Sequence, residues 1–227
     1  MNQCSCDGCE LKTLFFENVT TLEIESVCSR KEEKNFIKGE LIIKEGNDIK
    51  EFIYLKTGLV KLFRGMNTDK EQIICFAGPL DFVSLLSLFS DTHYNYSVSA
   101  LEDSVTCSIN LGEVKTLAAK NGKFAMSIIE KINKASDNII ITFLDVKQKR
   151  LFGRIAYILL YFAEKVYKNQ TFDLPISRKE IGEFIGMTTE NVIRTLSELR
   201  KDGIIKIYGK TIEIVELEKL KSIREHS

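Results

Sequence analysis

The sequence is poor in proline and histidine. The first shortage argues against a structural feature, and the second argues against a class of enzyme. Two prolines among 227 residues argue against long disordered linkers. The two histidines, His93 and His226, are far apart and cannot supply the clustered ligands of a cupin-like enzyme. The sequence also contains no nucleophile–base constellation and no glycine-rich phosphate loop, so we do not expect an enzyme.

Long apolar runs are missing as well. No run approaches the roughly 20 residues of a membrane-spanning helix, and the polar start, MNQCSCDGCE, has no signal-peptide core. We therefore expect a cytoplasmic protein with no membrane partner. The six cysteines are expected to be reduced in that compartment, so clustered ones call for a metal or thiol chemistry.

The net charge is zero, but it is unevenly distributed along the chain. Residues 147–227 hold 16 Lys and Arg against 11 Asp and Glu, while residues 1–146 hold 16 against 21. A charge of +5 on the C-terminal third and −5 on the remainder is typical of a protein that touches phosphates at one end only. The same asymmetry argues against the alternative that this end binds another protein.

The segment Ser177–Gly203 has the pattern of two short helices joined by a tight turn. Ser177 followed by Glu180 is a capping box, and Gly186 can supply the left-handed backbone of a sharp turn. Thr188 can cap a second helix, which has a buried stripe of Val192, Leu196 and Leu199. This pattern predicts a helix-turn-helix, whose second helix enters the DNA major groove.

The opposite face of the second helix suits base recognition. Its members are Thr189, Glu190, Ile193, Arg194 and Ser197. An arginine can donate two hydrogen bonds to guanine, a glutamate can accept one from cytosine, and an isoleucine can touch a thymine methyl. The alternative is a solvated helix face, because Glu190 and Arg194 also have the spacing of an ordinary surface ion pair.

The residues after Gly203 complete a winged domain. Alternating apolar residues on both sides of Tyr208-Gly209-Lys210 predict a β-hairpin, or wing. We expect this wing to place Lys206 and Lys210 near DNA phosphates.

The rest of the chain predicts a β-rich domain followed by a long helix. Short apolar runs punctuated by glycine, from Phe36 to Ile109, indicate a β-sandwich or jelly-roll barrel. A helix follows over about residues 124–148, with apolar residues alternately three and four apart. Its predicted seam consists of Ala125, Ile128, Ile132, Ala135, Ile139, Thr142 and Val146. A single helix packed on its own barrel would also be amphipathic, but spacing sustained over three heptads favours a helix that also pairs with a second copy of itself.

These elements, in this order, resemble the Crp/Fnr superfamily of bacterial transcription regulators. The resemblance is carried by KGELIIKEG at residues 38–46, LKTG at 55–58, Asp81-Phe82, GRIA at 153–156, residues 177–186 and YGKT at 208–211. It implies an α+β fold, with a jelly-roll-like β-barrel sensor domain and dimerisation helix over 1–148 and a winged helix-turn-helix over 149–227.

The resemblance also implies partners and contacts. The expected partners are a palindromic operator in double-stranded DNA, a second copy of the chain and RNA polymerase. Positions matching Glu190 and Arg194 contact bases in the superfamily, and those matching Ser177, Arg178 and Thr188 contact backbone phosphate. Thr189 and Ile193 match positions that vary with the operator.

Cyclic AMP is not the expected effector. The cyclic-nucleotide branch holds ribose and cyclic phosphate with a Gly-Glu-Leu run and a later Arg-Ser pair. The matching stretches here are Ser84-Leu85-Leu86 and Tyr94-Asn95-Tyr96, and no arginine occurs between Arg64 and Arg150. A cyclic phosphate would therefore lack its bidentate partner.

The cysteines suggest another signal. The oxygen-sensing branch holds a [4Fe–4S] cluster with an N-terminal Cys-x2-Cys-x5-Cys group and one later cysteine. Cys6, Cys9 and Cys107 match three of these ligands, Phe15 stands in place of the third N-terminal cysteine, and Cys4 is the candidate substitute. Four thiolates suit iron–sulfur or zinc.

Alternatives to a cluster stay open. Cys107 alternates with Val105 and Ile109 on a strand, so it can be a small core residue. Haem is a further candidate cofactor, although His93 lies in a polar stretch typical of a solvated loop. Cys28 and Cys75 are predicted to be structural.

Overall fold

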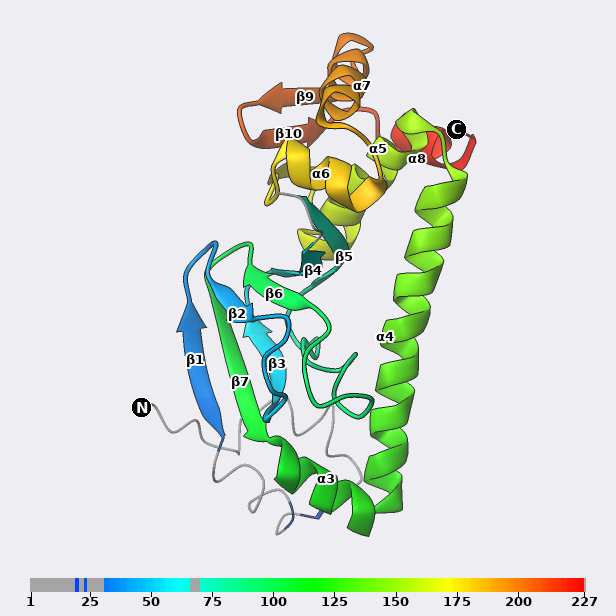
Figure 1. Ribbon diagram of the computed structural model, residues 1–227. Helices are drawn as coiled ribbons and strands as arrows, with labels where there is room; N and C mark the ends of the chain where they lie inside the picture. The colour runs from blue at the N-terminus through cyan, green and yellow to red at the C-terminus, as the bar shows by residue number, and fades with distance from the viewer. Residues whose placement is uncertain (1–18, 21–22, 24–30, 66–69, 227) are drawn as a thin grey trace. The chain divides into compact units, whose positions relative to one another are not determined.

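The computed structural model describes residues 19–20, 23, 31–65 and 70–226 (Figure 1). The chain forms two compact units, residues 1–65 with 74–139 and residues 66–73 with 140–227. No helix in the described part of the chain combines the length and apolar character that a membrane crossing requires.

Seven short strands lie among the described residues of the N-terminal half. They are β1 (Glu32–Phe36), β2 (Leu41–Ile43), β3 (Glu51–Thr57), β4 (Val60–Gly65), β5 (Glu71–Ala77), β6 (Ser97–Ala100) and β7 (Ser104–Asn110). They form two sheets, in the orders β1-β7-β3 and β2-β6-β4-β5. The predicted fold class is confirmed, with the strands grouped in two sheets that the described hydrogen bonds do not join into a closed barrel.

Apolar side chains of both sheets form the core of the first unit. Its fully buried members include Phe52, Leu55, Val60, Val98 and Ile109. The core extends to α3 (Leu111–Lys120) and to the first turns of α4 (Gly122–Gln148), where Phe124 and Ile128 are buried. Burying one such side chain stabilises a fold by about 1.5–3 kcal/mol, so this contact holds the start of α4 on the strands.

The predicted seam of α4 already makes contacts within the chain, since two of its seven residues are buried and the other five are half-buried. Its pairing with a second copy stays a prediction. Ile128 lies in the core of the first unit, Val146 is buried, and the Thr142 hydroxyl accepts a hydrogen bond from Tyr157 (3.2 Å). The face one residue further on is exposed. Six of its residues are exposed, which are Met126, Ile129, Asn133, Ile140, Phe143 and Lys147. The seventh, Ser136, is half-buried. These seven residues, which we call the outer seam, are also alternately three and four apart.

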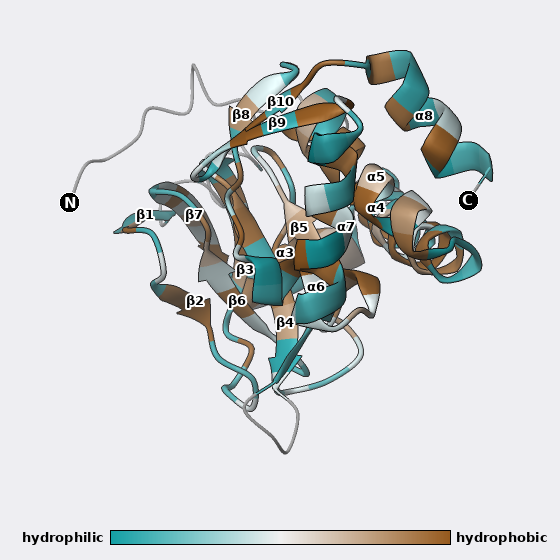
Figure 2. Ribbon diagram, turned by 90° about the horizontal axis from the view of Figure 1, so that it is seen from above, coloured by the Kyte–Doolittle hydropathy of each residue, from teal (hydrophilic) through white to brown (hydrophobic). Residues whose placement is uncertain are grey.

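The second unit contains the C-terminal elements (Figure 1). They are α5 (Leu151–Leu160), a π-helix (Tyr161–Val166), β8 (Thr171–Asp173), α6 (Arg178–Ile185), α7 (Thr189–Lys201), β9 (Ile205–Tyr208), β10 (Thr211–Ile214) and α8 (Leu217–His226). The strands form a sheet in the order β8-β10-β9. Helices α6, α7 and α8 each carry both hydrophilic and hydrophobic residues, as amphipathic helices do (Figure 2).

The apolar spacing of residues Arg150–Tyr167 predicts one helix, and in the structure the end of this helix widens into a π-helix. There the Tyr167 N–H donates to the Phe162 carbonyl, five residues earlier (2.9 Å). The apolar pattern is nevertheless correct, since Ile155, Ile158 and Leu159 are fully buried and so is Phe162. Apolar spacing does not distinguish the two helix types, because both place these residues on the inner face.

Candidate nucleic-acid interface

The two helices of the predicted helix-turn-helix begin and end where their local chemistry requires. The Ser177 hydroxyl accepts from the Glu180 N–H (3.2 Å), and the Glu180 carboxylate accepts from the Ser177 N–H (2.8 Å). Gly186 ends α6 with φ 66° and ψ 45°, the left-handed conformation that glycine adopts without strain. The Thr188 hydroxyl then accepts from the Asn191 N–H (3.3 Å) and caps α7. The capping box and both caps are confirmed.

The turn is tight because Gly182 has no side chain. A Cβ on this residue would lie 2.5 Å from the Met187 carbonyl oxygen, closer than real contacts allow. The Met187 N–H donates to the Gly182 carbonyl (2.9 Å), which closes the turn. This role was not predicted from the sequence, although an isolated glycine inside a helical pattern is itself a signal of close packing.

Helix α7 buries one face and exposes the other. The predicted stripe of Val192, Leu196 and Leu199 is buried, together with Thr195, which was not predicted. On the opposite face Glu190, Ile193, Arg194 and Ser197 are exposed, and Thr189 is half-buried. Ile193 is 51% exposed, which leaves its apolar surface available to a partner.

The two charged groups on this face, Glu190 and Arg194, do not form an ion pair with each other. The Arg194 Nη2 donates to the Asn191 Oδ1 (3.2 Å), and within the described residues no ion pair joins Arg194 to Glu190. The surface ion pair offered as the alternative interpretation is therefore not formed. The backbone N–H of Glu190 itself, and then the Thr188 hydroxyl, lower the pKa of the Glu190 carboxyl, so it is a charged acceptor at neutral pH.

Arg178, in the first turn of α6, is a half-buried cation. Burial lowers its pKa, and its side chain has no hydrogen-bond or ion-pair partner among the residues that the structure covers. A guanidinium that has lost part of its hydration without gaining a carboxylate suits a phosphate ligand.

The wing is the two-residue hairpin between β9 and β10. Tyr208 pairs with Thr211, and Gly209 adopts a φ of 62° in the turn. The two lysines differ. The Lys206 Nζ lies 2.9 Å from the Glu213 Oε1, and this hydrogen bond raises the pKa of Lys206. Lys210 is exposed at the tip, and the structure gives its ammonium no partner within the described residues.

The predicted metal ligands are only partly described. Cys4, Cys6 and Cys9 lie outside the described residues, as does Cys28. Cys107 is fully buried in the core of the first unit, on β7 opposite Tyr54 and Glu33. Across the described ranges, no three Cys, His, Asp or Glu side chains lie close enough together to hold a metal ion.

Neither Cys75 nor His93 has the surroundings expected of a metal or haem ligand. Burial raises the pKa of the Cys75 thiol to about 12, so it stays protonated and is a poor ligand or nucleophile. Both ring nitrogens of the exposed His93 contact neighbours, with Nε2 3.2 Å from the Asp48 Oδ1 and Nδ1 2.8 Å from the Thr92 hydroxyl.

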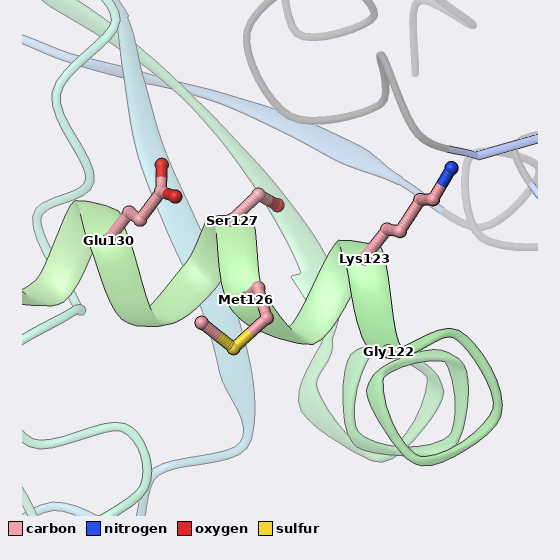
Figure 3. A pocket seen from close by; sticks show the side chains of 5 residues that line it. All are labelled: Gly122, Lys123, Met126, Ser127 and Glu130. Carbon is pink, nitrogen blue, oxygen red and sulfur yellow. The ribbon is translucent and has the colours of Figure 1, made fainter.

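The first turns of α4 border a hollow of about 320 Å³. Its described lining residues are Gly122, Lys123, Met126, Ser127 and Glu130. Figure 3 shows these side chains following one helix and pointing in different directions rather than converging on a point. We therefore assign no ligand to this hollow.

Two family models match the chain, and together they cover more than half of it. Residues 33–121 match the cyclic nucleotide-binding domain, and residues 153–223 match the Crp-like helix-turn-helix domain. Electron transport regulator A of Shewanella oneidensis is 28% identical over 219 residues, covering 93% of this chain and 86% of the relative. The fumarate and nitrate reduction regulatory protein of Escherichia coli is 25% identical over 230 residues, covering 98% and 91%.

Solved structures share the fold. FixK2 from Bradyrhizobium japonicum has a TM-score of 0.75 at 23% identity, covering 85% of this chain and 96% of that one. A transcriptional regulator of the Crp/Fnr family from Eubacterium rectale has a TM-score of 0.79 at 16% identity, covering 93% and 97%.

The β-rich domain, the long helix and a helix-turn-helix with an exposed second helix define a DNA-binding transcription regulator, not an enzyme. The chain belongs to the Crp/Fnr superfamily, as its motifs predicted.

Proposed function

We propose that this protein is a homodimeric, sequence-specific regulator in which α7 reads bases in the major groove. The observation that carries the proposal is the outward face of α7, where an ionised Glu190, an exposed apolar Ile193 and Arg194 lie together. Arg194 would bind guanine, Glu190 would accept from cytosine N4, and Ile193 would touch a thymine methyl. Thr189 and Ser197 flank them and would adjust the operator preference.

Backbone phosphates would bind around this face. The Ser177 and Thr188 hydroxyls lie at the starts of α6 and α7, where N–H groups and the helix dipole also favour an anion. Arg178 is the strongest candidate, because it is half-buried and has no partner within the described residues. On the wing, Lys210 can bind a phosphate directly, whereas Lys206 would first have to leave Glu213.

The salt dependence of binding tests the Arg178 assignment. Each phosphate contact contributes about 0.9 to the slope of log K against log salt concentration. We expect Arg178→Gln to lower this slope by about two in a dimer and to weaken all duplexes alike. The measurement is a titration of the palindrome that the wild-type protein selects from random DNA. Lys179→Gln, a neighbouring cation that is 3.7 Å from the Glu183 carboxylate, is the matched control. An unchanged slope would remove Arg178 from the interface.

The outer seam of α4 is the proposed dimer surface. Met126, Ile129, Ile140 and Phe143 are each 46–58% exposed, and their heptad spacing matches a second copy of the same helix. In a parallel pair each residue meets its own copy, so Asn133 would face Asn133 of the second chain and fix the register. Such a pair would carry two α7 helices, which must lie about 34 Å apart to enter successive major grooves. RNA polymerase is proposed as a further partner from the family alone.

The proposed signal is a redox event in the sensor domain. The support comes from two relatives, which are an electron transport regulator and a fumarate and nitrate reduction regulatory protein. Cys4, Cys6, Cys9 and Cys107 would supply the four thiolates that an iron–sulfur cluster needs. The full burial of Cys107 among apolar side chains favours the other interpretation, in which it is a core residue.

An absorption spectrum with metal analysis distinguishes these two interpretations. If the thiolates hold a cluster, protein purified without oxygen will contain iron and sulfide and will absorb broadly in the visible range. Cys6→Ser will abolish that band, while Cys75→Ser will preserve it, because the raised pKa of Cys75 keeps its thiol protonated. A colourless, metal-free wild-type protein would contradict the cluster and transfer the sensing role to another ligand.

The standard cyclic-nucleotide mode is not proposed. The Ser84 hydroxyl, in the stretch that matches the Gly-Glu-Leu run, is buried and accepts a hydrogen bond from the Ile53 N–H (2.9 Å). The Tyr96 hydroxyl donates to the Val83 carbonyl (3.0 Å). Both hydroxyls are therefore already engaged in hydrogen bonds within the sensor domain.

A further inference from the structure

Arg154 lies in the first turn of α5 and binds four backbone carbonyls. Its Nε donates to the Lys149 carbonyl (2.8 Å) and its Nη2 to the Lys147 carbonyl (3.4 Å). Its Nη1 donates to the carbonyls of Ile185 (3.1 Å) and Gly186 (3.2 Å). A single guanidinium therefore joins the end of α4 to the turn of the helix-turn-helix.

The chemistry of these four acceptors explains why an arginine stands here. The last carbonyls of a helix have no partner within the helix, and they carry the negative end of its dipole. Lys147 and Lys149 lie at the end of α4, and Ile185 and Gly186 at the end of α6. A planar guanidinium with five N–H donors can satisfy both helix ends at once, whereas an ammonium on a flexible chain cannot hold the same geometry.

The connection extends directly to the recognition helix. Thr188, which caps α7, follows Gly186 by two residues, and the Met187 N–H between them is held by Gly182. A second hydrogen bond, from the Tyr157 hydroxyl to Thr142, ties α5 to α4 at another point. The start of α7 is thus connected to the end of α4 through the hydrogen bonds of Arg154 and the short segment from Gly186 to Thr188.

We infer that Arg154 is a positioning residue that fixes the angle between the end of α4 and the recognition helix. The inference rests on the proposed function, because it assumes that a pair of α4 helices presents two α7 helices to one operator. Arg154 does not contact DNA in this role. It sets the distance and rotation between the two half-sites that the dimer accepts.

The preference of the dimer for one spacing between half-sites can be measured, and a general loss of stability would not change this preference. Adding one base pair between half-sites turns one relative to the other by about 35°. The probes are the palindrome selected by the wild-type protein and the same duplex with one or two base pairs added or removed. We expect the full-length wild-type protein to bind the original spacing at least ~10-fold more tightly. Arg154→Met should reduce this preference to about twofold, and Arg154→Lys should give an intermediate value.

Arg150→Met is the matched control, since Arg150 is an exposed arginine that makes no side-chain cap on the same helix. It should keep the wild-type spacing preference. A folded Arg154→Met or Arg154→Lys protein with unchanged preference would overturn the inference, and so would failure of both variants to fold, which would assign Arg154 to stability alone. If the wild-type protein selects no palindrome, the proposed function itself fails, a result distinct from either of these.

Discussion

Arg194→Ala is expected to remove most of the sequence preference of the protein. A bidentate arginine–guanine pair contributes about 1–3 kcal/mol of discrimination, and a dimer on a palindrome makes it twice. The expected loss is therefore about 2–6 kcal/mol, or roughly 30-fold to 10⁴-fold in affinity for the selected operator. Binding to random DNA should change little, because phosphate contacts supply it.

The measurement is a competition titration that compares the selected operator with random duplex. Arg200→Ala is the matched control, because Arg200 is an exposed arginine in the last turn of the same helix. It removes the same charge but lies away from the N-terminal half that reaches base edges. If Arg194→Ala keeps the wild-type preference for the operator, α7 does not read bases through this residue.

The winged domain was predictable from sequence because short-range chemistry determines its elements. The Ser177–Glu180 capping box, the glycine at 186 and the Thr188 cap each act within a few residues of chain. The contacts that tie the turn to other helices are not local. Arg154 binds carbonyls more than 30 residues away, and only tertiary structure brings these groups together.

The face of α4 was not predictable from the heptad pattern alone. Ile139, Ile140 and Ile141 are consecutive, and Phe143 and Leu144 follow them, so apolar residues occupy several faces of the helix. Two seams, one residue apart, therefore satisfy the same three–four spacing. The choice between them depends on which side meets the core and α5, and long-range packing determines that side.

The strands show the same limit. β1 and β6 have no strand pattern of their own in the sequence, because EEKNF is polar and SVSA is small and mostly polar. β1 lies at the edge of its sheet, where it pairs with β7 alone and needs few apolar residues. All four residues of β6 are buried between two neighbouring strands, so its serines are interior. Strand propensity and periodicity carry no information about such positions.

Ile140→Glu in the outer seam is expected to separate the two subunits. Ile140 is 55% exposed in the single chain, and in a parallel pair it would be buried against its own copy. Losing that burial on both chains costs about 3–6 kcal/mol, and two facing carboxylates add repulsion. The dissociation constant of the dimer should therefore rise by ~10²-fold to 10⁴-fold or more.

Sedimentation equilibrium at a series of protein concentrations measures this effect, and operator binding should fall with it. Asn138→Glu is the control, since it adds the same charge at an exposed position of α4 that is outside the outer seam. Both variants keep the buried side of the helix intact, so both should retain the wild-type circular dichroism spectrum. A dimer that tolerates Ile140→Glu as well as it tolerates Asn138→Glu would place the subunit contact elsewhere. The spacing of the two α7 helices would then have to be set by an element other than α4.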